Sequence, residues 1–200
     1  MRILHQVIAT AWALAWVAIP CNAQSAATPA ASPRAQLEQL THALAGKWKL
    51  DVQFAADSAS GTPATTGAGE ESWSAGPGGI TLIEQEVIPS PQGEIFLMGV
   101  IWWDGARNQL SGMECNSYLP GTCDLKGALN DIAMSWDGRK FQIDEREVHN
   151  GRHTVWHEYW TDITPDSFTQ LGDVTRPDGT TTRFLTIHGT RVKQLKSLGG

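Results

Sequence analysis

The stretch that indicates the fold most clearly is residues 132–160, IAMSWDGRKFQIDEREVHNGRHTVWHEYW. Apolar and polar side chains alternate there, and Asp137-Gly138 and Asn150-Gly151 divide the stretch into three segments. Alternation of this kind is typical of β-strands with one buried face. Asp-Gly and Asn-Gly pairs favour the tight turns of β-hairpins, because those turns need residues with positive φ. The stretch therefore predicts three consecutive antiparallel strands.

Turn geometry predicts which side chains of these segments share a face. With two-residue turns, Met134 lies opposite Phe141 across the first turn, and Phe141 lies opposite Trp160 across the second. Side chains two positions apart in a strand point to the same side, so one face collects an apolar set with two carboxylates. Its members are Ile132, Met134, Trp136, Phe141, Ile143, Glu145, Trp156, Glu158 and Trp160. We expect this face to line the inside of a closed sheet.

Short alternating segments and turn pairs continue through the chain after Gly46. Strands are expected near residues 47–55, 69–75, 80–88, 94–103, 108–116, 128–136, 139–148, 152–163, 167–176 and 181–192. Most connections between them are short, whereas a β-sandwich needs long crossings. Closure also removes the unpaired edges of a sheet. The sequence therefore predicts an all-β fold, an antiparallel up-and-down barrel of about eight to ten strands.

A short helix is expected ahead of the first strand. Ser32 can cap its N-terminus, and Pro33 suits the first helical position. Three leucines follow with helical spacing and form one apolar stripe: Leu37, Leu40 and Leu44. Gly46 then favours the end of the helix.

The first residues are typical of an export signal. Met1-Arg2 supplies a positive start, residues 7–19 form an uncharged apolar run, and Ala23 ends a group of small residues suited to cleavage. The run is shorter than the roughly 20 residues of a membrane span. We expect a periplasmic or secreted protein with no span in the mature chain; retention of the run as an anchor is the alternative. The predicted divisions are a signal peptide at 1–23, a flexible linker at 24–33, the barrel domain at 34–194 and a tail at 195–200.

Composition and motifs exclude several classes of partner. The net charge is −6 with 41% hydrophobic residues, so the chain can form a core but lacks the basic surface that binds nucleic acid. His149, His153 and His157 are spaced by four, yet the Asn-Gly pair breaks any helix there. On a strand the last two lie about 13 Å apart, too far to share a metal ion. Motifs of phosphate-binding loops, zinc proteases and serine hydrolases are absent from the sequence. We therefore expect no cofactor, no metal and no nucleic-acid partner, and the oligomeric state stays open.

Two cysteines remain after removal of the signal peptide, Cys115 and Cys123. Pro120-Gly121 between them marks a turn that can bring the two thiols together. Disulfides persist in exported proteins. We therefore expect a disulfide between these two residues that closes a small loop.

Two carboxylates fall on the predicted inner face, those of Glu145 and Glu158. A buried carboxylate is costly unless it is paired, hydrogen-bonded or wet. One interpretation places both residues near an open rim of the barrel. The other is a pocket that holds a cationic or polar group between carboxylates and aromatic rings.

Short motifs at both ends of the predicted barrel carry a family resemblance. Gly46-Lys47-Trp48 opens the first strand directly after the helix, and Arg191 follows the last strand. This pattern resembles the lipocalin-like barrels of the calycin superfamily, and more closely the exported bacterial domains of unknown function with that fold. The resemblance implies a barrel in which Arg191 packs on Trp48 in a structural role. It implies no activity, since a fold does not determine function. The glycine-rich continuation of haem-binding relatives is missing after Trp48, so no haem is expected.

Three functional hypotheses follow. The first is an exported soluble barrel that binds a small, mostly apolar ligand, with Glu145 and Glu158 as polar contacts. Its wall would be formed by Trp136, Phe141, Ile143, Trp156 and Trp160. The second is a filled barrel that serves as a structural or protein-interaction module of the cell envelope, with Trp102 or Trp103 in an exposed apolar patch. The third is an enzyme that uses the two carboxylates in acid–base chemistry.

Overall fold

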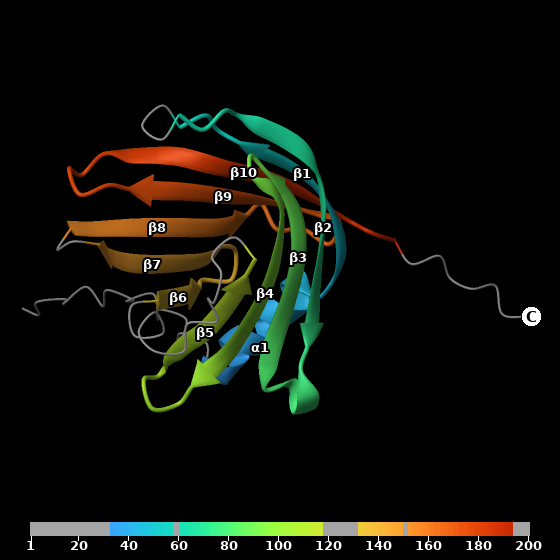
Figure 1. Cartoon of the computed structure of the whole chain (residues 1–200). Coiled ribbons are helices and arrows are strands. Elements are labelled where there is room, and N and C mark those ends of the chain that lie inside the picture. Colours follow the sequence, from blue (N-terminus) through green and yellow to red (C-terminus); the bar gives the residue numbers. More distant parts are fainter. Residues whose placement is uncertain (1–32, 58–60, 118–131, 150–151, 194–200) are drawn as a thin grey trace, which may run out of the picture. The chain divides into compact units, whose positions relative to one another are not determined.

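A computed structural model describes residues 33–57, 61–117, 132–149 and 152–193. The described residues form an all-β closed barrel of ten antiparallel strands, with one short helix at its N-terminal side (Figure 1). The predicted fold class is confirmed. The signal peptide, the linker up to Ser32, the tail and Cys123 lie outside the described residues. The export signal, the flexible linker, the Ser32 cap, the tail and the disulfide therefore stay predictions.

The strands follow one another around the barrel in chain order, and β1 pairs with β10 to close it. They are β1 (Gly46–Phe54), β2 (Thr65–Ala75), β3 (Thr81–Ser90), β4 (Gly93–Asp104), β5 (Gln109–Asn116), β6 (Ile132–Trp136), β7 (Phe141–His149), β8 (Arg152–Thr161), β9 (Ser167–Thr175) and β10 (Thr181–Arg191). A single 3₁₀ turn, η1 (Pro77–Gly79), lies between β2 and β3. Because each strand has two neighbours, the sheet has no unpaired edge strand.

The register between β7 and β8 matches the prediction. Phe141 lies opposite Trp160, and Glu145 lies opposite Trp156. The register between β6 and β7 differs, because Met134 lies opposite Ile143 rather than Phe141. The difference is two residues, so the same side chains still point inward.

The cause of this correction is a four-residue turn between β6 and β7. The backbone N–H groups of Arg139 and Lys140 both donate to the Asp137 carboxylate, at 2.8 and 2.7 Å. Gly138 takes the positive φ that the turn requires, at 94°. The Asp-Gly pair therefore does form a turn, but the turn is longer than the two residues predicted.

Helix α1 (Pro33–Leu44) supplies apolar side chains to the barrel core. Leu37, Leu40 and Leu44 are all buried, and the helix contacts strands β2 to β5 (Figure 1). The helical spacing of these leucines explains why one face of α1 turns inward. In the described residues, no helix has both the length and the apolar character needed to cross a membrane.

Arg191 and Trp48 join the end of β10 to the end of α1. The Arg191 guanidinium lies 4.0 Å from the centre of the Trp48 ring. It donates hydrogen bonds to the carbonyl oxygens of Ala43, at 3.0 Å, and of Ala45. The Trp48 indole N–H donates to the carbonyl oxygen of Leu44 at 2.9 Å. These contacts satisfy carbonyl groups that the helix end leaves without partners.

Candidate functional site

The barrel interior contains a largely enclosed cavity with about 30 Å³ of space for the centres of water-sized groups. This space holds about two waters. Strands β3 to β8 form its lining, which consists of Glu84, Gly99, Ile101, Met113, Glu114, Ile132, Met134, Ile143, Glu145, Trp156 and Glu158. The cavity therefore combines an apolar wall with several carboxyl groups.

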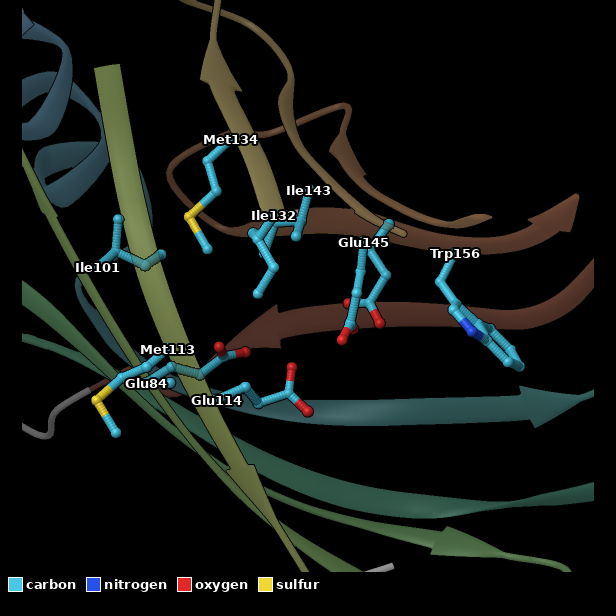
Figure 2. Close-up of a pocket in the computed structure, with 11 residues that line it drawn as sticks. Glu84, Ile101, Met113, Glu114, Ile132, Met134, Ile143, Glu145 and Trp156 are labelled. Atoms are coloured by element: carbon cyan, nitrogen blue, oxygen red, sulfur yellow. The ribbon is translucent and has the colours of Figure 1, made fainter. Parts of the chain in front are cut away.

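The carboxyl groups approach one another from opposite walls. Figure 2 shows Glu84 and Glu114 on one side and Glu145 on the other, with their carboxyl groups directed toward the space between them. Glu158 lies opposite Ile143 in the sheet and also lines the cavity. None of the described residues in this lining is Lys, Arg or His.

A missing side chain on β4 makes room for one of these carboxyl groups. Gly99 lies opposite Glu84 in the register of β3 and β4. A Cβ atom at position 99 would be 2.6 Å from Oε2 of Glu84, closer than carbon and oxygen approach without a shift. Glycine at this position therefore allows the Glu84 side chain to lie across β4.

Two further glutamates lie in the interior beside Glu84. Glu71 on β2 faces Glu86 on β3 directly, and their exposed fractions are 3% and 4%. Neither carboxyl oxygen of Glu71 has a hydrogen-bond partner of good geometry among the described residues, and neither does one oxygen of Glu86. Buried polar atoms are normally hydrogen-bonded, so these oxygens need an explanation.

Burial raises the pKa values of the interior carboxyl groups. Loss of solvation is the largest cause, and repulsion from neighbouring carboxylates adds to it. The pKa of Glu71 and of Glu158 rises from the usual 4.5 to about 8. Burial also raises the pKa of Glu84 and Glu86 well above the usual range, and that of Glu114 in the same direction. With pKa values of about 8, Glu71 and Glu158 hold a proton at neutral pH in the absence of a compensating cation.

Two amide side chains share the interior with the carboxyl groups. Asn116 donates to Glu114 at 2.9 Å, and Gln170 donates to Glu158 at 3.4 Å. Gln170 is 3% exposed, and its side-chain oxygen has no partner among the described residues. The side-chain oxygen of Gln170 is therefore a buried acceptor without a donor among the described residues.

The structure divides the predicted ligand wall into two groups. Ile143, Glu145, Trp156 and Glu158 line the cavity. The other three predicted residues are aromatic and belong to the packed core: Trp136, Phe141 and Trp160.

Contacts among these aromatic residues explain their place in the core. The rings of Phe141 and Trp160 are 5.1 Å apart, and Trp73 meets Trp160 edge-on at 6.0 Å. The Trp136 indole N–H donates to Gln39 of helix α1 at 3.3 Å. These rings fill the interior rather than line a free space.

Sequence reasoning missed four interior glutamates, although their spacing carried a signal. Glu71 is two residues from Trp73, and both are buried. Leu82, Glu84, Glu86 and Ile88 are likewise spaced by two and all buried. Glu114 on β5 completes the set. The period of two places each glutamate on the inner face with its apolar neighbours.

His157 on β8 lies on the outer face of the barrel and contacts both neighbouring strands. His157 lies opposite Asp144, with 2.6 Å between Nδ1 and the carboxylate, and its Nε2 lies 3.1 Å from the Thr175 hydroxyl. His153 is exposed on the same strand. Within the described ranges, no group of three or more His, Cys, Asp or Glu side chains is arranged to hold a metal ion.

Trp102 and Trp103 are not among the exposed large apolar residues of the outer face. Trp102 and Trp103 are both half-buried. Phe96 and Met98 on β4 are 55% and 39% exposed. Both line a wide open hollow along β1 to β5, and the buried residues Trp48, Glu71 and Glu86 line it as well.

Fold and site together define a closed, ten-stranded antiparallel barrel whose interior cavity is rich in carboxyl groups. No protein-family model matches the chain, and no curated protein matches it. Similar solved structures include EF1p2_mFAP2b bound to DFHBI, with 12% identity, a TM-score of 0.40, and coverage of 78% of this chain and 99% of that chain. Another is a redesigned β-barrel with 11% identity, a TM-score of 0.32, and coverage of 78% and 96%. Membership of the calycin superfamily stays a prediction.

Proposed function

We propose that this protein is an exported barrel that binds a small molecule in its interior cavity. The observation that carries the proposal is the cavity itself, where an apolar wall meets the carboxyl groups of four glutamates. Ligand sites in proteins commonly combine apolar walls with a few convergent polar groups. Export is supported by the signal-like residues 1–23.

The size of the cavity limits how the ligand enters. A space of about 30 Å³ is far smaller than the several hundred Å³ of a typical ligand pocket. A ligand larger than a few atoms must therefore displace side chains. Met134 lines the cavity, and methionine side chains adapt readily because they are unbranched and flexible. The apolar part of the ligand would contact Ile101 and Ile143.

Native mass spectrometry of the protein purified from its own host tests this proposal. A discrete extra mass, absent after denaturation, is the expected result. Ile143→Phe adds volume at the cavity wall and should abolish the extra mass. Gln142→Phe, whose side chain lies on the outer face of the same strand, should retain it. An extra mass that persists in Ile143→Phe, or no extra mass in the unaltered protein, would contradict an interior ligand.

A further inference from the structure

Acidic groups are concentrated in the part of the barrel interior that the structure describes, and no basic side chain is among the described residues that line the cavity. The six interior glutamates come from β2, β3, β5, β7 and β8: Glu71, Glu84, Glu86, Glu114, Glu145 and Glu158. The cavity lining described above contains no basic side chain, and the buried polar residues among the described ranges are glutamates, Ser111 and Gln170. Burial of one carboxylate without a partner is costly, and burial of several near one another costs more.

These carboxyl groups influence one another across the interior. Repulsion from Glu71, Glu114 and Glu158 acts on the Glu84 carboxyl group. Glu158 in turn is affected by Glu114 and Glu145. A positive charge in the cavity would therefore stabilise several carboxylates at once.

Gln170 provides an independent sign that a donor is expected in the interior. Its amide nitrogen donates to Glu158, whereas its side-chain oxygen is buried and has no partner in the described part of the chain. A group with several N–H donors and no acceptor would suit this oxygen, because Gln170 is hydrogen-bonded to Glu158, which lines the cavity. An alkylammonium group has this donor pattern.

We propose that the interior cavity takes a small organic cation, an alkylammonium whose charged end lies among the four glutamates that line the cavity. The inference rests on the proposed function and adds the chemical class of the ligand. The alkyl part would contact the apolar wall at Ile101 and Ile143, which line the same cavity. Trp156 lies beside Glu145 at the cavity, and aromatic rings stabilise nearby cations (Figure 2).

The alternative of a purely neutral, apolar ligand leaves the acidic groups unexplained. Such a ligand would remove water from the carboxyl groups and offer no donor in return. An ammonium instead exchanges for the protons on these groups, because the ionised carboxylates are stabilised when the cation binds. Binding of the cation should therefore release protons to the buffer near neutral pH.

Isothermal titration calorimetry with a matched pair of probes tests this inference. The probes are 1,4-diaminobutane, which is dicationic at pH 7, and 1,4-butanediol, which has a similar length and no charge. We expect the diamine to bind with proton release, measured as a difference between buffers of unequal ionisation enthalpy. The diol should not bind.

Three substitutions locate the binding. Glu114→Gln and Glu158→Gln should each weaken diamine binding about tenfold, the effect of one lost charge interaction of about 1.4 kcal/mol. Glu70→Gln changes the exposed neighbour of Glu71 and should leave binding unchanged. Circular dichroism spectra that match the unaltered protein establish that each variant is folded.

Other outcomes overturn the inference in distinguishable ways. Binding of the diol as tightly as the diamine would reject the cationic ligand and leave the proposed function standing. Binding of calcium chloride with proton release, without binding of the diamine, would replace the organic cation with a metal ion. Failure of every probe, together with no retained mass in native mass spectrometry, would reject both the inference and the proposed function.

Discussion

At the scale of single residues, Arg191 shows how one side chain can secure the end of the barrel. Its guanidinium stacks on Trp48 and reaches the carbonyl oxygens of Ala43 and Ala45. Gly46 makes this approach feasible, because a Cβ atom there would collide with the guanidinium, and its φ of 145° suits glycine. A planar group with several donors is needed for stacking and hydrogen bonding together.

Replacement of Arg191 by lysine should therefore destabilise the barrel. We expect Arg191→Lys to lower the free energy of unfolding by about 1–3 kcal/mol, since the ammonium cannot stack in the same way or reach all the carbonyl oxygens. Urea denaturation measures the change. Arg183→Lys is the control, because Arg183 forms an exposed ion pair with Asp173 and should lose at most about 1 kcal/mol. Equal losses in the two variants would contradict the role assigned to Arg191.

At the scale of elements, the turn between β6 and β7 shows what sequence patterns predict and what they do not. Asp-Gly pairs indicate a turn, but they are compatible with more than one loop length. The length here depends on the Asp137 carboxylate, which accepts from two backbone N–H groups. The inner face was predictable despite the wrong pairing of Met134, because a shift of two residues preserves side-chain direction.

Loss of the Asp137 carboxylate should weaken this turn. We expect Asp137→Ala to lower the free energy of unfolding by about 1 kcal/mol, because two backbone donors lose their acceptor. Asp137→Asn keeps one side-chain oxygen and should lose less. Thermal unfolding followed by tryptophan fluorescence measures both variants. An alanine variant as stable as the unaltered protein would show that solvent replaces the carboxylate without cost.

At the scale of the whole molecule, the sequence predicted the barrel fold but only some of the residues that line its cavity. Alternation and turn pairs indicated ten strands, and short connections favoured closure. Ile143 and Glu158 were assigned to the inner face and line the cavity, whereas Phe141 is packed in the core. The opposite acidic wall at Glu84 and Glu114 was missed. Side-chain packing decides how much space remains, and a residue pattern does not contain that volume.

The acidic interior should make stability depend on pH in an unusual direction. Between about pH 5 and pH 8, the folded protein retains protons on Glu71 and Glu158 that the unfolded chain has lost. The free energy of unfolding must then fall as pH rises, by up to about 1.4 kcal/mol per pH unit for each group. Urea denaturation at several pH values measures the slope.

Two variants test whether the interior carboxyl groups cause this slope. Glu158→Gln removes one carboxyl group whose pKa is raised, so the free energy of unfolding should depend less on pH. Glu70→Gln on the outer face should not change the slope. A free energy of unfolding that stays constant or rises from pH 5 to pH 8 would show that the interior carboxyl groups are not held in their protonated form.

The central claim is that the barrel encloses a cluster of acidic groups suited to a positively charged ligand. Carbon-13 NMR titration of the glutamate side-chain carboxyl groups in the purified protein tests it most directly. We predict that Glu71 and Glu158 titrate with midpoints of about 8. Midpoints near 4.5 for both interior groups would contradict the claim, because they would mean that these carboxylates are ionised and solvated at neutral pH.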